Sequence, residues 1–248
     1  LPHMTVINTC DFNQTKAATI AIADHQGPVY LRFGRPAVPN FTSSEQKFEI
    51  GKAVTLNNGT DITIIATGHL VWEAIEASKT LAESNINAEV INIHTIKPLD
   101  KDVIIKSALK TGCVVTAEEH NRFGGLGESV AQTLVSNHPV PQEFVAVNDS
   151  FGESGTPAQL MEKYGLNADA IVAAAQKTGV SNPAGFFKIQ TYIPARKIIL
   201  PPPYTVQKKK ETKKSRCRAP LKTCSRKSFS KKSHNAKNHD NNTSSCCK

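Results

Sequence analysis

Short runs rich in Ile, Val, Thr and Ala alternate with amphipathic segments between about residues 61 and 180. The runs are predicted as strands, and they are residues 61–66 (DITIIA), 88–93 (AEVINI), 113–117 (CVVTA) and 144–147 (FVAV). Strands that alternate with helices in this way are typical of a parallel sheet covered by helices. The pattern therefore predicts an α/β fold, a three-layer sandwich with a mostly parallel sheet in the middle.

The segments between these strands have the spacing of helices. After the first strand, five apolar residues share one helical face with the small Ser78 between them; they are Val71, Ala74, Ile75, Leu81 and Ala82. Asp100 is predicted as the N-cap of a helix over residues 101–110, and Gly112 as its stop. Three further helices are predicted, over residues 128–135, 157–164 and 168–177.

Residues 1–41 repeat this pattern on a smaller scale. A strand at residues 4–7, a helix at 13–23 and a strand at 28–32 form one βαβ unit. So few residues leave sheet edges and one face open and bury too little surface to fold alone. We interpret them as the end of a partial α/β domain, joined through a linker at about residues 36–46 to a second domain over residues 42–180. The first methionine is Met4, so we expect the sequence to be a fragment.

The charge of the chain is divided by position. The 248 residues carry a formal net charge of +9, which by itself suggests a nucleic-acid or anionic-surface binder. Residues 206–248 hold 14 Lys and Arg and two acids, a net of +12, whereas residues 1–205 hold 16 and 19, a net of −3. Only the end of the chain is basic. Its Lys/Ser/Asn-rich composition predicts a linker and disordered tail over residues 181–248.

Composition also bounds the location of the protein. No run of about 18 apolar residues occurs, and the N-terminal residues lack the pattern of a signal peptide, so we expect no membrane span and a cytoplasmic location. Cys10 and Cys113 stand alone in apolar contexts. They fit buried, reduced thiols better than a disulfide framework.

Seven groups of residues resemble, in order, the C-terminal portion of transketolase, most closely the form made as two polypeptides. The strings are LPHMTVI at 1–7, GPVYLRFGRP at 27–36, IGKAVTL at 50–56, DITIIATG at 61–68, TIKPLD at 95–100, TAEEHNRFGGLGE at 116–128, and DSFGESG at 149–155 with YGL at 164–166. The resemblance covers about residues 1–178. It implies that residues 1–41 end a thiamine-diphosphate pyrimidine-binding domain and that residues 42–180 form the transketolase C-terminal domain.

The resemblance also implies an activity. Such enzymes use thiamine diphosphate and magnesium to move a two-carbon ketol unit from a ketose phosphate to an aldose phosphate, in the pentose phosphate pathway. In the family, the magnesium-diphosphate site and the activating glutamate belong to segments that this sequence does not match. We therefore assign no catalytic, cofactor-binding or metal-binding residue to the chain, and we expect it to be inactive alone. The implied partners are sugar phosphates, a second copy in a homodimer, and a separate N-terminal transketolase subunit.

One family position is carried over to a particular residue. Transketolases grip the substrate phosphate with an arginine after the last strand of the pyrimidine-binding domain, and GPVYLRFGRP places Arg35 there. The planar guanidinium suits this role because it can donate two hydrogen bonds to phosphate oxygens. Arg32, inside the predicted strand, is the second candidate. For both residues the alternative is a salt bridge at a domain face.

A second group of polar residues looks chemical but is interpreted as structural. The turn at residues 124–127 could bind an anion through its backbone N–H groups, although such a turn is more often a packing solution. Glu118, Glu119 and His120 are expected to make polar contacts at an interface. The remaining histidines are expected in loops, caps or the surface; they include His3, His25, His69 and His94.

The basic tail offers an alternative of a different class. Its Lys and Arg runs could neutralise phosphates, so the chain could be a basic-tailed nucleic-acid or partner-binding protein with a non-catalytic α/β body. Phe229 is the only aromatic residue after Tyr204, so a stacking platform for single strands is lacking. The spacing of Cys217 and Cys224 also disfavours a zinc finger.

Overall fold

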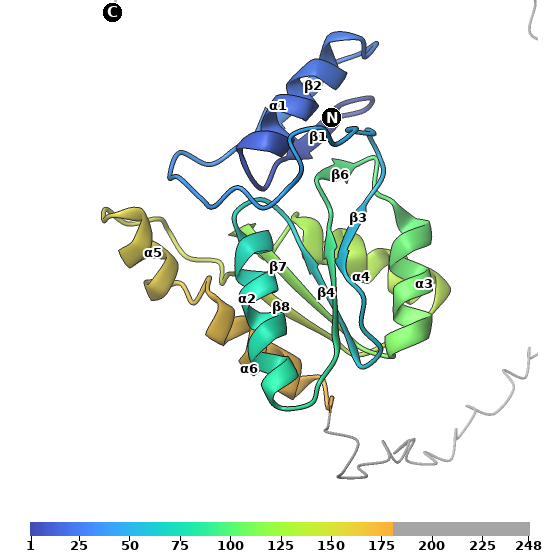
Figure 1. The fold of residues 1–248 in the computed structure, drawn as a ribbon, viewed down its shortest axis with the longest axis vertical. Coiled ribbons are helices and arrows are strands. Elements are labelled where there is room, and N and C mark those ends of the chain that lie inside the picture. Colours follow the sequence, from blue (N-terminus) through green and yellow to red (C-terminus); the bar gives the residue numbers. More distant parts are fainter. Residues whose placement is uncertain (181–248) are drawn as a thin grey trace, which may run out of the picture. The chain divides into compact units, whose positions relative to one another are not determined.

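The structure is a computed structural model that describes residues 1–180. The tail predicted over residues 181–248 lies outside the described residues. Residues 1–180 all fall within one compact unit. It holds two sheets, one of five strands and one of three (Figure 1).

The larger sheet confirms the predicted fold. Its strands follow the order β3-β5-β4-β7-β8, and the bounds are Val54–Asn57, Ala88–Asn92, Ile62–Ala66, Val114–Asn121 and Gln142–Val147. All neighbours pair in parallel except β3, which runs antiparallel to β5 at one edge. The sheet is therefore mostly parallel, as the sequence predicts.

Helices cover both faces of this sheet. Helix α2 (Leu70–Glu83) and helix α6 (Ala168–Lys177) lie on one face, and α3 (Lys101–Thr111) and α4 (Leu126–Asn137) lie on the other (Figure 1). Every residue of the central strand β4 is buried, because it contacts a helix layer on each side. Ile64 belongs to the core under α2 and α6, whereas its neighbour Ile65 belongs to the core under α3 and α4. The three-layer sandwich is thereby confirmed.

The helix ends follow from local side-chain chemistry. The Asp100 carboxylate accepts a hydrogen bond from the Val103 N–H, and Gly112 ends α3 in the left-handed conformation with φ of 74°. Thr156 and Gln159 form a reciprocal capping box at the start of α5 (Pro157–Lys163). The predicted stop and cap of α3 are both confirmed.

The smaller sheet has three strands and adjoins the larger sheet. Strand β1 (Thr5–Asn8) pairs in parallel with β2 (Val29–Arg32), and α1 (Phe12–Ala23) connects the two. On its other side β1 pairs antiparallel with β6 (Thr95–Lys97). The expectation that residues 1–41 leave both sheet edges open is thus wrong for one edge, because a strand from the second predicted domain covers it.

The segment predicted as a linker is held by hydrogen bonds. Asp11 caps α1 at the Gln14 N–H, and its carboxylate also accepts from the backbone N–H groups of Phe41 and Thr42 and from the Thr42 hydroxyl. The Phe41 ring packs against Trp72 of α2, with centroids 5.7 Å apart. Residues 41–42 are therefore fixed to both parts of the chain.

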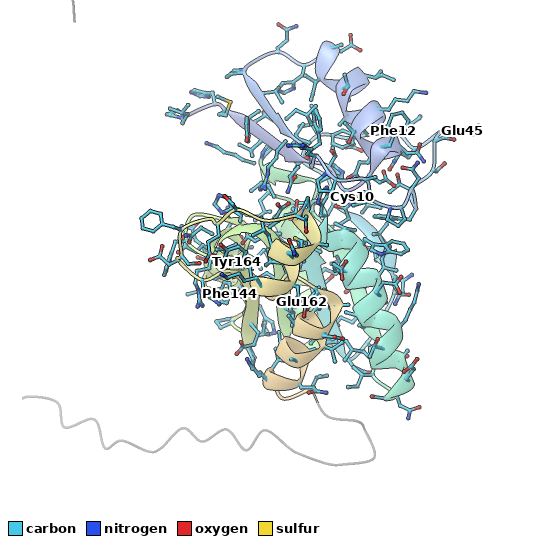
Figure 2. The ribbon with its side chains drawn as sticks, turned by 90° about the vertical axis from the view of Figure 1, so that its left-hand side faces the viewer. Cys10, Phe12, Glu45, Phe144, Glu162 and Tyr164 are labelled. Atoms are coloured by element: carbon cyan, nitrogen blue, oxygen red, sulfur yellow. The ribbon has the colours of Figure 1, made fainter. Side chains whose placement is uncertain are left out.

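A buried polar contact joins the two sheets near Cys10, which Figure 2 places where they meet. The Asn92 amide at the end of β5 donates to the Cys10 sulfur (3.3 Å) and to the Gln14 side-chain oxygen (3.2 Å). Both thiols in the described residues, Cys10 and Cys113, are free and buried, as predicted. Burial raises the pKa of each thiol above its ordinary value, so both remain protonated and unreactive.

Several boundaries differ from those predicted. Strand β7 continues through Asn121 and β8 begins at Gln142, while β3 and β6 had no predicted counterpart. Ala82 was predicted on the buried face of α2 but is exposed. Ala77 is buried on that face instead. The division into domains at residues 41 and 180 stays a prediction.

Candidate functional site

The larger sheet has a switch point between β4 and β7. From β4 the chain moves to β5 on one side, then crosses to β7 on the other side and continues to β8. In open α/β sheets, ligands bind outside the carboxyl ends of the strands at such a point. His69 follows β4, and Glu119 and His120 lie at the end of β7. The end of β2 approaches this same edge through Arg32.

A pocket of about 540 Å³ opens at this edge. Its lining includes the charged side chains of Arg32, Arg35 and Glu119 and the two histidines His69 and His120. Apolar residues from α5 and the following turn, including Leu160, Met161 and Leu166, form another part of the wall. The pocket thus joins the segment after β2 to the switch point of the larger sheet.

Three of these side chains, those of Glu119, Arg32 and His69, lie close together. The Oε2 atom of Glu119 lies 3.7 Å from the Arg32 Nη2 atom and 3.7 Å from the His69 Nδ1 atom. Glu119 is about 40% exposed and Arg32 about 33% exposed, so solvent screens their attraction. This group is the interface contact that the sequence suggested for Glu119, and it connects both predicted domains.

Close packing fixes the position of His69. Gly34 lies directly against the imidazole ring, and a Cβ atom at that position would fall 1.7 Å from the His69 Nε2 atom. Only glycine can be accommodated there without movement of the ring. The turn that carries Arg35 therefore packs against His69, which follows β4.

The two predicted phosphate-binding residues occupy different settings. Arg32 ends β2 and is half-buried, facing Glu119. Arg35 lies three residues beyond the strand, is exposed, and forms no salt bridge within residues 1–180. Both line the same pocket, so the structure brings the two candidates together. Their role in binding phosphate stays a prediction.

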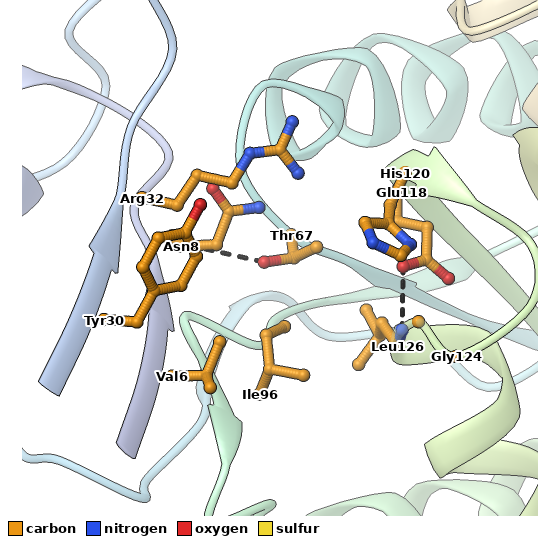
Figure 3. A pocket seen from close by; sticks show the side chains of 11 residues that line it. Val6, Asn8, Tyr30, Arg32, Thr67, Ile96, Glu118, His120, Gly124 and Leu126 are labelled. Carbon is orange, nitrogen blue, oxygen red and sulfur yellow. Dashed lines mark hydrogen bonds between the residues drawn. The ribbon is translucent and has the colours of Figure 1, made fainter. Parts of the chain in front are cut away.

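Arg32 also borders a second, smaller cavity of about 270 Å³ (Figure 3). Arg32, Tyr30 and Asn8 lie on one side of it, and Glu118 and His120 on the other. Thr67 lies between them and donates a hydrogen bond to the Asn8 carbonyl oxygen.

Glu118 has a structural role. Its carboxylate accepts hydrogen bonds from the N–H groups of Leu126 (2.7 Å) and Gly127 (2.8 Å), at the start of α4. Gly125 packs against the same carboxylate, where a Cβ atom would lie 2.2 Å from Oε2. Burial raises the pKa of Glu118, and the two N–H groups oppose that rise. The turn at residues 124–127 thus already binds an anionic group of the chain itself, which supports the structural interpretation of this turn.

His94 lies in the short connection between β5 and β6, one of the settings expected for these histidines, but it is buried there. This residue is 2% exposed, its ring stacks on Phe48 with centroids 4.1 Å apart, and Nδ1 contacts the Thr95 hydroxyl at 3.0 Å. Burial lowers the pKa of His94 to about 4, against the attraction of Asp100. Asn92 and Ile93 before it are also buried, and the short β6 follows it.

Sequence reasoning therefore missed His69 as a site residue and gave Glu119 no chemical role. The available signal was their position at or just beyond the ends of two neighbouring parallel strands, at the switch point. That signal requires the strand order, which a single sequence does not provide.

Comparison with known proteins identifies this α/β domain. The family described as "Transketolase, C-terminal domain" matches residues 51–171. The 6-deoxy-6-sulfo-D-fructose transketolase subunit of Clostridium sp. (strain MSTE9) is 46% identical over 71% of this chain and 55% of its own length. A subunit of the apulose-4-phosphate transketolase of Phocaeicola vulgatus is 41% identical over 70% and 56%. A solved structure, "Split gene transketolase, inactive beta4 tetramer", superposes with a TM-score of 0.68 at 43% identity, over 72% of this chain and 57% of that one.

Residues 51–171 are a transketolase C-terminal domain, and enzymes of the transketolase family depend on thiamine diphosphate. The first two relatives are named as transketolase subunits, and the solved structure is described as a split gene transketolase. The chain spans about half the length of the curated relatives it matches. These matches do not favour the alternative of a nucleic-acid-binding protein with a non-catalytic body. In the part of the chain that the structure describes, no helix is long and apolar enough to cross a membrane.

Proposed function

We propose that this chain is the C-terminal part of a thiamine-diphosphate- and magnesium-dependent transketolase. The complete enzyme would transfer a two-carbon ketol unit from a ketose phosphate to an aldose phosphate, in the cytoplasmic pentose phosphate pathway. The observation that carries the proposal is the 46% identity to a subunit of a split transketolase over 71% of the chain. In this assignment residues 1–41 end the pyrimidine-binding domain and residues 42–180 form the C-terminal domain.

The proposed enzyme requires a second polypeptide. The sulfo-fructose and apulose-4-phosphate relatives are both named as transketolase subunits, and a structural relative is described as an inactive tetramer of β chains. A separate N-terminal transketolase subunit would therefore complete the active site, and two copies of each chain would form the assembly. Strand β2 supports this proposal because it is an edge strand with an exposed Tyr30 beside an exposed Phe33.

In the proposed enzyme the separate subunit would hold the magnesium and the diphosphate of the cofactor. A magnesium-diphosphate group needs clustered oxygen ligands, and residues 1–180 hold no group of three or more His, Cys, Asp and Glu side chains placed to bind a metal ion. We therefore derive no step of the reaction through the cofactor from this chain. Its own contribution in the proposed function is to bind and orient the substrate.

The substrate phosphate is proposed to bind in the pocket at the switch point. Arg35 is the first ligand, because its exposed guanidinium lies on the pocket wall free of salt bridges in residues 1–180. Arg32 is the second ligand. Its contact with Glu119 at 3.7 Å is screened by solvent, so a phosphate can replace it. Two guanidinium groups hold a phosphate at a fixed distance from the reacting carbonyl, which raises the rate through orientation.

The class of sugar that carries the phosphate is part of the proposal. The relatives are named for a sulfo-fructose and for apulose 4-phosphate, which differ in both sugar and anionic head group. We propose a ketose phosphate donor for this chain, because a pair of arginines suits the dense negative charge of a phosphate.

Ketol transfer by a reconstituted enzyme tests the proposal. The full chain is mixed with the N-terminal polypeptide of a split transketolase, thiamine diphosphate and magnesium, and transfer from a ketose phosphate to an aldose phosphate is measured. We expect transfer by the mixture and none by this chain alone. Transfer by the chain alone would contradict the need for a partner, and a mixture that assembles but does not transfer would contradict the proposed activity.

The same assay tests the arginines. We expect Arg35→Gln to raise KM for the phosphorylated donor by about 10-fold or more, since a hydrogen bond to a charged group contributes about 1.5–3 kcal/mol. The matched control is the corresponding donor without its phosphate, for which the wild type and the variant should have the same KM. An equal loss with both donors would show that Arg35 acts on the fold rather than on the phosphate.

A further inference from the structure

Glu119 occupies an unusual place in the proposed phosphate pocket. Successive side chains of β7 point to opposite sides, so Glu118 turns toward the start of α4 while Glu119 faces the pocket. Glu119 is the one carboxylate among the residues that line this pocket. The other ionisable side chains there include Arg32, Arg35, His69 and His120.

The Glu119 carboxylate lies near two side chains of the pocket without a hydrogen bond to either. A single oxygen, Oε2, lies 3.7 Å from both the Arg32 guanidinium and the His69 ring. Both distances exceed a hydrogen bond, so the donors of Arg32 stay available to a ligand. Gly34 packs directly against the His69 ring, so the ring cannot shift toward the turn that carries Arg35. A ligand that binds Arg32 must therefore come to rest beside the negative charge of Glu119.

We propose that Glu119 determines the charge preference of this pocket, by weakening the binding of doubly charged head groups more than that of singly charged ones. This inference rests on the proposed role of Arg32 and Arg35 as anion ligands. The physical reason is that Coulomb repulsion between the carboxylate and the ligand is proportional to the ligand charge. If Glu119 lowers the affinity for a monoanion by a given factor, it therefore lowers the affinity for a dianion at the same position by the square of that factor.

Removal of the charge tests this inference on the full 248-residue chain. Binding of methyl phosphate and of methanesulfonate is measured by NMR titration at about pH 8 and low ionic strength, where the first probe is a dianion and the second a monoanion. Charge pairs at partly exposed sites change affinity by about threefold. We therefore expect Glu119→Gln to tighten methanesulfonate binding about threefold and methyl phosphate binding about tenfold.

A matched control separates this effect from net charge. Glu83 is exposed at the last residue of α2, about 20 Å along the helix from His69 at about 1.5 Å per residue. Glu83→Gln changes the net charge by the same amount and should leave both affinities unchanged. A similar gain in this variant would attribute the effect to the overall field of the protein and would overturn the assignment to Glu119.

The remaining outcomes distinguish the two proposals. Weaker binding of both probes in Glu119→Gln would show that the carboxylate positions Arg32 for the ligand, and equal changes for both would show no charge preference. Either result overturns this inference and leaves the anion pocket in place. Binding that persists unchanged in Arg32→Gln and Arg35→Gln, or no binding at all, overturns the proposed phosphate pocket and the inference with it.

Discussion

Single residues in this chain owe their properties to the contact between its two sheets. His94 lies at the point where the chain leaves β5 for β6, and its carbonyl oxygen accepts a hydrogen bond from the Asn8 N–H at 2.8 Å. Its ring is buried against Phe48 and beside the Thr95 hydroxyl, which also accepts from the Gly51 N–H. A proton on this ring would place a charge in the middle of the contact.

The stability of the chain should therefore fall in mild acid. The pKa of His94 is lowered from 6.5 to about 4, so between these values the unfolded chain binds a proton that the folded chain does not. The contribution of His94 is complete above pH 6.5, is lost progressively as the pH falls, and is exhausted near pH 4. The loss amounts to about 3 kcal/mol. Urea unfolding from about pH 7 to about pH 4 measures it.

Two variants assign this loss to its residue. His94→Gln removes the titrating ring and should flatten the pH dependence, whereas His3→Asn, at an exposed histidine, should preserve it. The comparison is needed because burial raises the pKa of Glu118, which stabilises the folded chain as the pH falls and opposes the effect of His94. An unchanged slope in His94→Gln would contradict the assignment.

At this scale the sequence was informative only where a residue's local chemistry decided its role. The conformation of Gly112 and the cap at Asp100 depend on neighbours within a few residues, and both were predicted. The burial of His94 and the contact of Glu119 with Arg32 depend on residues far away in the chain. A sequence pattern read along the chain contains no direct signal for such contacts.

Among the elements, α1 shows how one cap can do more than end a helix. The Asp11 carboxylate is 3% exposed and accepts four hydrogen bonds, one inside α1 and three from residues 41 and 42. Thr156 caps α5 at the surface and bonds only within its own capping box. The two caps therefore differ in whether they connect one element to another.

Substitution of the two caps should separate these roles. Thr156→Ala should cost about 1 kcal/mol of unfolding free energy, as an ordinary cap does. Asp11→Ala should cost at least about 3 kcal/mol, because it also leaves the N–H groups of residues 41 and 42 without their charged acceptor. Chemical denaturation measures both losses. Equal costs would show that the bonds to residues 41 and 42 add nothing.

A second measurement identifies the connection itself. Trp72 is the only tryptophan of the chain, and Phe41 packs on it. In the folded protein, Asp11→Ala should shift the fluorescence of Trp72, since the segment that carries Phe41 loses its anchor. Thr156→Ala should leave the emission unchanged. A shift in both variants, or in neither, would contradict the role of Asp11 as an anchor for this segment.

The elements predicted from the sequence were those with a clear period. Helices α2, α3 and α6 show an apolar stripe or a cap, and the buried strands β4, β5 and β7 each contain two or more consecutive β-branched residues. Strands β3 and β6 have only four and three residues, and β6 is stabilised by pairing with β1, far earlier in the chain. Such strands are determined by tertiary pairing rather than by local propensity.

For the whole described chain, the decisive feature is that one segment belongs to both sheets. Residues 88–92 form β5 inside the larger sheet, and only three positions later residues 95–97 form β6 inside the smaller one. Backbone hydrogen bonds fix this passage on both sides, from the Ile93 N–H to the Ala66 carbonyl and from the Asn8 N–H to the His94 carbonyl. Neither sheet can lose its pairing without disturbing this segment.

We therefore expect residues 1–180 to unfold as one cooperative unit, although the sequence divides them into two domains. Native-state hydrogen exchange followed by mass spectrometry measures the free energy of opening for each peptide. Peptides from β1 and from β4 should reach the same maximal free energy and respond equally to urea. The residues on α1 that are exposed should exchange at lower free energies and serve as the internal reference for local opening. If β1 instead opened at a lower free energy while β4 remained protected, residues 1–41 would be a separate unit whose stability awaits the rest of its own domain.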